Sequence, residues 1–152
     1  MLPYLLGENA LMLPLNEHDH TFGYERGNSS VEWDVSAIWD AVEHLPVVKI
    51  PISMVSDAVM EASKTWKKDD WERVKEADLS YPPIVSSELT QFNIDPYKVV
   101  QSYLIIDGYH RTMKAIKAGH KELEVKMISV MPAPKSTKGT PFKINGLNFN
   151  WR

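Results

Sequence analysis

The residues best suited to chemistry lie together in the segment Ile106-Asp107-Gly108-Tyr109-His110-Arg111. The apolar run 103–106 before it is typical of a buried strand, and helical spacing follows it. A helix that begins here presents unpaired backbone N–H groups and about half a positive charge, so anions bind readily at its N-terminus. Gly108 allows a ligand to approach the backbone closely. The segment therefore predicts a phosphate-binding turn that includes the backbone of Gly108 and Tyr109.

Three side chains of the following helix could take part. Arg111 carries a planar guanidinium that suits phosphate oxygens. His110 can donate a hydrogen bond or carry a proton, and Lys114 lies one helical turn beyond it. An alternative stays open, in which Asp107-Gly108 is an ordinary turn and Arg111 and Lys114 belong to a solvated helix face.

Asp107 ends the strand and has two possible roles. Its carboxylate is the hard oxygen ligand that Mg²⁺ prefers, so it could hold a magnesium ion on a bound phosphate. It could equally cap the helix that starts at Gly108. The two roles do not exclude each other, and we expect Asp107 and His110 to be the catalytic residues if the protein is an enzyme.

The segment 104–128, LIIDGYHRTMKAIKAGHKELEVKMI, resembles the strand–D/G-G-x-H-R–helix–A-G–strand element of the ParB/sulfiredoxin superfamily. Upstream, VVKIPISMV resembles that family's leading strand, and DLSYPPIV resembles the segment that brings a second strand alongside. The resemblance covers residues 47–128, about half of the chain. It implies a nucleotide cofactor (ATP, ADP or CTP), with Mg²⁺ possible, whose phosphates are held by Gly108, His110 and Arg111.

Members of this family differ in chemistry, and the chain departs from several of them. Sulfiredoxins carry a catalytic cysteine where this chain has Tyr109, and the chain contains no cysteine, which excludes sulfinic-acid reduction. Free-serine kinases carry a similar D-G-H-H-R element and need a carboxylate base, for which Glu43, Asp57 and Glu61 are candidates. ParB partition proteins add a helix-turn-helix domain, and nothing after Ile128 resembles one.

Three functions follow from the resemblance and stay open. The first is nucleotide binding with phosphoryl transfer or nucleotide hydrolysis, with the phosphates at the DGYHR turn. The second is a ParB-like nucleic-acid-binding protein or nuclease, although a nuclease needs paired acidic metal ligands and only Asp107 is evident. The third is a non-catalytic interaction protein of the small kind found in phages.

The elements that must position this turn follow from periodicity and from proline and glycine positions. We predict an α/β or α+β fold in a single domain, with one small mixed sheet and packed helices. Val35, Ile38, Trp39, Val42 and Leu45 form one apolar helical stripe after Asp34. The other expected elements are a strand at 47–52, helices from Ser53 and from Asp69, a strand at Ile84, a loop at 88–98, a helix ending at Gly119 and a strand at 123–127.

We expect residues 1–32 to be irregular, with a polar loop at 16–30, and residues 33–131 to form the ParB/sulfiredoxin-like domain. Residues 132–152 are expected to wrap that domain as a tail. This tail has five possible apolar anchors: Phe142, Ile144, Leu147, Phe149 and Trp151.

Composition limits the partners. Residues 1–107 hold 8 Lys/Arg and 18 Asp/Glu, a net charge of −10, whereas residues 108–152 hold 9 and 2, a net charge of +7. This basic C-terminal third indicates either a local anionic partner, nucleic acid included, or neutralisation by the acidic part of the chain. No apolar run is long enough for a membrane span, and without a secretory signal we expect a cytoplasmic protein with no membrane partner.

Some further residues have a structural interpretation beside the functional one. His18-Asp19-His20 could bind a metal, but we interpret it as a solvated loop. Trp33, Trp66 and Trp71 could stack on a base, although helical spacing favours the core. Arg73 and Asp78 flank the YPP segment and either reach the site or form a surface ion pair.

Overall fold

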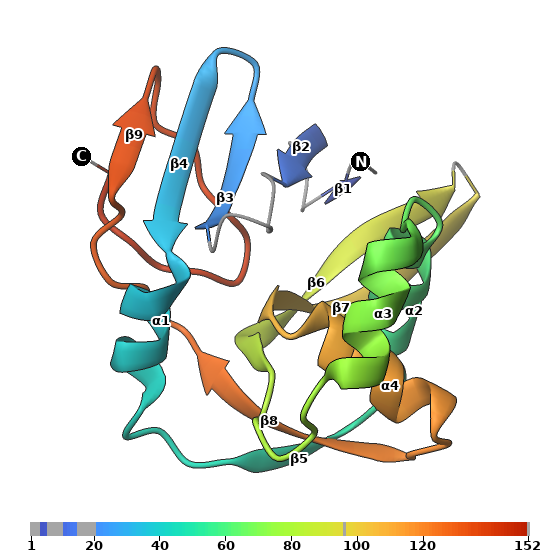
Figure 1. The fold of residues 1–152 in the computed structure, drawn as a ribbon. Coiled ribbons are helices and arrows are strands. Elements are labelled where there is room, and N and C mark those ends of the chain that lie inside the picture. Colours follow the sequence, from blue (N-terminus) through green and yellow to red (C-terminus); the bar gives the residue numbers. More distant parts are fainter. Residues whose placement is uncertain (1–3, 6–10, 15–20, 96, 152) are drawn as a thin grey trace.

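The chain forms two β-sheets with helices packed beside them (Figure 1). The computed structural model describes residues 4–5, 11–14, 21–95 and 97–151. In the first sheet, every pairing is antiparallel and the order is β1 (Tyr4–Leu5), β2 (Leu11–Pro14), β3 (Thr21–Arg26), β4 (Ser29–Asp34) and β9 (Ser136–Lys138). In the second sheet the order is β5 (Val48–Pro51), β8 (Glu122–Ile128), β6 (Ile84–Asp95) and β7 (Lys98–Asp107), and only β6 and β8 are parallel.

The described residues contain four helices, α1 (Val35–Val42), α2 (Ser53–Ser63), α3 (Lys68–Glu76) and α4 (Tyr109–Lys117). Helix α2 packs on β7, and α4 packs on both α2 and α3, so these three helices form a layer beside the second sheet (Figure 1). Helix α1 lies apart from them and connects the two sheets. The fold is a mixed α+β arrangement, as predicted, but it has two sheets where one small sheet was expected.

The second sheet is buried on both of its faces. In β7, Leu104 and Ile106 belong to the apolar cluster that includes Trp33 of the first sheet. Ile105, between them, belongs to a second cluster with Met113 of α4, because successive strand side chains point to opposite faces. This double burial holds the end of β7 firmly, which fixes the position of the turn that follows it.

The N-terminal part differs from the expected irregular segment. Strands β3 and β4 form a hairpin that turns at Gly27, where φ is +59°. Phe22, Tyr24, Val31 and Trp33 are all buried. The polar residues between them hid this alternation in the sequence, which is why a loop was predicted.

The segment 88–98 is also not the loop that was predicted. Strand β6 continues to Asp95 and β7 begins at Lys98, so the two form a long hairpin. Gln101 and Val99 are exposed on this hairpin. A solvent-exposed antiparallel pair needs little apolar alternation, because its backbone hydrogen bonds form regardless of side-chain type.

Helix α2 begins at Ser53, as predicted, and α3 begins at Lys68, one residue before the predicted Asp69. The backbone N–H of Lys67 donates to Asp70 Oδ2 at 3.1 Å, so Asp70 caps the start of α3. Ser53 is the first residue of α2 and not its cap. The side chain of Asp70 is thereby oriented at the start of α3, where it faces α4.

The C-terminal segment lies against the first sheet. Strand β9 pairs with β4, and the indole N–H of Trp33 donates to the carbonyl oxygen of Pro132 at 2.7 Å. Phe142, Ile144 and Leu147 are buried in the same cluster as Trp33. Trp33 is thus a core residue, as predicted. Among the described residues, no helix has both the length and the apolar character needed to cross a membrane.

Candidate functional site

A cavity of about 860 Å³ opens beside the turn between β7 and α4. Its wall comes from α1, from the end of α3 and the loop after it, and from the turn itself. The charged and aromatic residues among those that line it are Trp39, Asp40, Glu43, Arg73, Asp78, Tyr81, Asp107, Tyr109, His110, Arg111 and Lys126. The volume lies within the range that is common for small-molecule sites. The structure therefore brings the predicted turn and a cavity together.

Gly108 is required by the fold itself. Its φ is +107°, which side chains rarely tolerate, and a Cβ placed on it would lie 2.7 Å from Pro83 Cβ. The residue is the N-cap of α4. Gly108 was predicted to allow close approach of a ligand, but the close approach in the structure is to Pro83. A larger residue here would disturb folding before it blocked a ligand.

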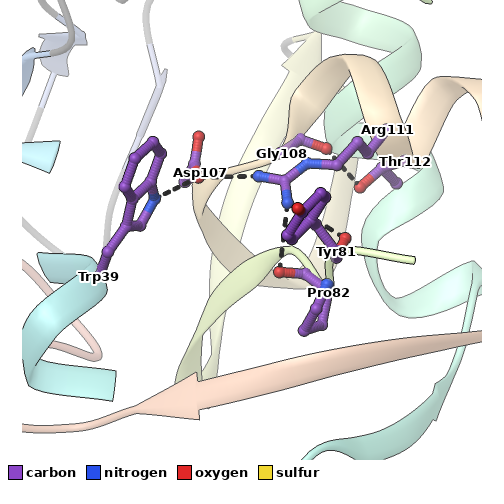
Figure 2. A network of polar contacts seen from close by, with 7 residues as sticks. All are labelled: Trp39, Tyr81, Pro82, Asp107, Gly108, Arg111 and Thr112. Atoms are coloured by element: carbon purple, nitrogen blue, oxygen red, sulfur yellow. Dashed lines mark hydrogen bonds and ion pairs between the residues drawn. The ribbon is translucent and has the colours of Figure 1, made fainter. Parts of the chain in front are cut away.

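Asp107 and Arg111 form the centre of a polar network at the cavity (Figure 2). Arg111 Nη2 donates to Asp107 Oδ2 at 2.8 Å, and Arg111 Nη1 donates to the carbonyl oxygen of Tyr81 at 3.1 Å. The indole N–H of Trp39 donates to the same Asp107 oxygen at 2.8 Å. Asp107 thus connects α1 to the turn through side-chain donors of Trp39 and Arg111.

Two exposed aromatic side chains belong to this network. Trp39 was predicted to be buried on the apolar stripe of α1, but 48% of it is exposed. Tyr81 is 64% exposed, while its carbonyl group holds Arg111. Figure 2 shows the Trp39 indole approaching Asp107 from α1, with Tyr81 beside Arg111. Trp39 is therefore held at the cavity by its indole N–H and Tyr81 by its carbonyl group, and the apolar surfaces of both rings stay accessible.

His110 contacts a carboxylate that sequence reasoning did not connect with the site. Its Nε2 lies 3.1 Å from Oδ1 of Asp70, which is 8% exposed. The imidazole packs against Trp66 with ring centroids 4.9 Å apart, and Trp66 contacts Trp71 edge-on. These two tryptophans pack against the core cluster of the helical layer, as predicted. Asp70 lies 40 residues from His110, so no local pattern could have paired them.

Lys114 does not take the phosphate-binding position that was predicted for it. Its Nζ donates to the carbonyl oxygens of Lys75 and Ala77, at 2.8 and 2.7 Å, and it is not among the cavity-lining residues. These carbonyls end α3, so Lys114 completes that helix end. Lys126 does the same for α1, donating to the carbonyl oxygens of Val42 and Glu43 at 3.1 and 3.0 Å.

Tyr109 lines the cavity but is only 7% exposed, and its side chain belongs to the core under the helical layer. Only its backbone N–H suits a role in anion binding. Of the three candidate bases, Glu43 lines the cavity, whereas Asp57 and Glu61 do not. Glu61 instead pairs with Lys64 at 2.7 Å.

Arg73 and Asp78 both line the cavity, which agrees with the interpretation that they reach the site. The hydroxyl and the backbone N–H of Ser80 donate to Asp78 Oδ1 at 2.7 and 2.9 Å. These bonds are the main cause of a pKa of Asp78 below its usual value, and the charges of Lys114 and Arg111 lower the pKa further. Asp78 therefore stays ionised at the cavity down to acidic pH.

The described part of the chain contains no group of three or more His, Asp or Glu side chains that could hold a metal ion. Asp107 is a single carboxylate, and only its Oδ2 accepts the hydrogen bonds from Trp39 and Arg111. Its donor set fits a Mg²⁺ ion that arrives with phosphate oxygens, because such ions need only one or two carboxylates. The segment His18-Asp19-His20 lies outside the described residues.

Compared with known proteins, the chain matches no family model, no curated protein and no solved structure. The ParB/sulfiredoxin resemblance thus stays a hypothesis based on the residues of the turn.

Proposed function

We propose that the chain binds a nucleotide in the cavity beside the β7–α4 turn. The observation that supports this most is the conjunction of a helix N-terminus, an arginine and two exposed aromatic rings around one cavity. Backbone N–H groups at a helix start favour anions, and aromatic faces favour the bases of nucleotides. The resemblance of the D-G-Y-H-R segment to the ParB/sulfiredoxin superfamily points to the same ligand class.

The residues of the β7–α4 turn would contact the nucleotide in different ways. The backbone at Gly108, Tyr109 and His110 would hold a phosphate at the start of α4. Arg111 would contact a phosphate oxygen while it keeps its bond to the Tyr81 carbonyl group. Asp107 would hold Mg²⁺ that arrives with the nucleotide, and the ion would supply charge neutralisation on the phosphate.

The proposed reaction is phosphoryl transfer or nucleotide hydrolysis, in which catalysis depends mainly on positioning and charge stabilisation. His110 lies at the cavity and is held by Asp70, which suits a side chain that must keep one orientation. Glu43 is the candidate base that remains, because it lines the same cavity. Nucleotide binding requires neither the His110 role nor the Glu43 role, so a non-catalytic binding protein stays the alternative to an enzyme.

The nucleic-acid alternative has less support. Several basic side chains of the C-terminal third contact the protein itself. Lys135 lies 3.2 Å from Asp34, Arg111 lies 2.8 Å from Asp107, and Lys114 and Lys126 donate to backbone carbonyls. Those side chains are therefore engaged within the fold, and the two ion pairs agree with the second explanation of the charge asymmetry. Phosphate-backbone binding usually depends on cations that are accessible to the nucleic acid.

A thermal-shift screen tests the proposal, with ATP, ADP, CTP, GTP and AMP, each with and without Mg²⁺. A ligand at 100 times its Kd adds about 2.7 kcal/mol of stability, which is several degrees for a domain of this size. Trp39→Ala should remove the shift. Met60→Ala is the matched control, because Met60 is 50% exposed and lies on α2 away from the cavity. No shift with any of these nucleotides would refute the proposed function.

A further inference from the structure

The charges around the cavity limit how much negative charge its ligand can carry. Three cationic side chains line it, Arg73, Arg111 and Lys126. Four carboxylates line it as well: Asp40, Glu43, Asp78 and Asp107. Apart from His110, three positive and four negative side chains leave a net charge of −1. The N-terminus of α4 adds about half a positive charge, so the wall is close to neutral.

The cations are also engaged within the protein. Lys126 donates to two carbonyl groups at the end of α1 and so offsets the negative end of that helix. Arg111 donates to Asp107 and to the carbonyl groups of Tyr81 and Pro82. A polyphosphate would have to compete with these bonds for donors. One phosphate group at the start of α4 needs only the backbone N–H groups and the remaining donors of Arg111.

The indole of Trp39, the aromatic part of the α1 side of the cavity, is fixed by a hydrogen bond within the protein. The N–H of Trp39 is committed to Asp107, which fixes the edge of the indole and leaves its face as the contact surface. Asp40 and Glu43 follow on the same helix, and both are exposed at the cavity. A ligand beside Trp39 therefore meets two accessible carboxylates on α1, and Asp78 adds a third from the loop after α3.

From this arrangement we infer that the cavity selects nucleosides and nucleoside monophosphates over nucleoside di- and triphosphates. The inference rests on the proposed nucleotide binding and narrows its ligand class. Of the two proposed reactions, it favours hydrolysis of a nucleoside monophosphate over phosphoryl transfer from a triphosphate. Each further phosphate adds negative charge near a wall whose described residues include one lysine, Lys126, which already donates to two carbonyl groups. The aromatic contact, by contrast, is the same for all members of the series.

Calorimetric titration of the full chain tests this with adenosine, AMP, ADP and ATP, in EDTA at constant ionic strength. We expect AMP to bind roughly fivefold or more tightly than ATP, because the two added charges meet the exposed carboxylates of Asp40 and Glu43. Mg²⁺ should reduce that ratio, since the ion neutralises the polyphosphate.

Neutral variants show whether the α1 carboxylates cause the preference. The double change Asp40→Asn and Glu43→Gln should improve ATP binding severalfold and leave adenosine binding unchanged. Glu88→Gln is the matched control, because Glu88 is exposed but does not line the cavity. It should change neither value.

The outcomes separate the inference from the proposed function. Tighter binding of ATP than of AMP in EDTA, lost in Trp39→Ala, would overturn the inference and leave nucleotide binding intact. A preference for AMP that persists unchanged in the Asp40/Glu43 variant would overturn the charge explanation. Absence of binding by all four ligands would overturn both.

Discussion

Two walls of the cavity differ in how their polar groups are satisfied. On the turn wall, formed by Asp107, Gly108, His110 and Arg111, the charged side chains bond to the protein itself. On the α1 wall, formed by Trp39, Asp40 and Glu43, the two carboxylates make no hydrogen bond or ion pair to another described residue. The turn wall is thus part of the framework, whereas the α1 wall keeps its charges for a ligand.

This difference predicts two classes of variant. Changes in the turn wall and in its supports should lower the free energy of unfolding, because they leave bonded groups without partners. Changes to the exposed carboxylates of α1 should alter ligand preference at nearly constant stability. A turn-wall variant that alters only ligand preference, or an α1-wall variant that lowers the free energy of unfolding, would show that the two walls were assigned to the wrong roles.

The largest effect is expected for Gly108→Ala. The positive φ costs an alanine about 1–2 kcal/mol, and the contact with Pro83 adds roughly 1–3 kcal/mol of overpacking. Gly119→Ala is the matched control, because φ there is also positive, at +81°, while nothing lies within 4 Å of the added Cβ. Urea denaturation should show a clear excess loss for Gly108→Ala. Equal losses would mean that Pro83 moves aside freely.

The next largest effect is expected for Asp70→Asn. Hydrogen bonds to a charged group contribute about 1.5–3 kcal/mol, and Asp70 is buried between His110 and the backbone N–H of Lys67. Asp69→Asn removes a charge from the same helical turn, but Asp69 is exposed, so the cost should be a few tenths of a kcal/mol. Similar unfolding free energies for the two variants would show that Asp70 does not support the turn wall.

A smaller effect is expected for Lys114→Met. The change removes two hydrogen bonds to the end of α3 and should cost about 1–2 kcal/mol. Lys117→Met is the control, because Lys117 is exposed and only its ammonium group lies over the Trp71 ring, at 5.0 Å. Nucleotide affinity should be unchanged in both variants. A loss of affinity in Lys114→Met alone would return Lys114 to the phosphate site that the sequence predicted.

The sequence predicted elements well where apolar residues follow one period. The buried strand end of β7, the helix that starts after Gly108 and three residues of the α1 stripe (Val35, Ile38 and Val42) appear in the structure. The β3–β4 hairpin and the outer part of β6 and β7 were missed, because polar residues dominate them and pairing between strands stabilises them. Local propensity does not report such non-local pairing.

The sequence predicted that the turn residues lie together, but it did not predict which residues surround them. Asp107 to Arg111 are contiguous, so one short pattern was enough to place them on a common wall. Asp70 and Trp39 reach the same place from α3 and α1, through contacts across 40 and 68 residues. Lys114 was misassigned because its helical spacing predicted the correct face but not the carbonyl groups that the end of α3 presents there.

The smallest effect is expected on the pKa of Asp78. This carboxylate lines the cavity but belongs to neither wall, and it accepts a hydrogen bond from the hydroxyl of Ser80. Ser80 is the main cause of its lowered pKa, so Ser80→Ala should raise the pKa toward the ordinary value of 3.8. A lowered pKa in the folded state stabilises that state above the unfolded pKa, and the contribution is lost as the pH falls through the folded pKa. The variant should therefore lose this contribution at a higher pH than the parent. A carboxyl NMR titration measures the shift directly, and an unchanged pKa would assign the lowering to the backbone N–H of residue 80 and to the charges of Lys114 and Arg111.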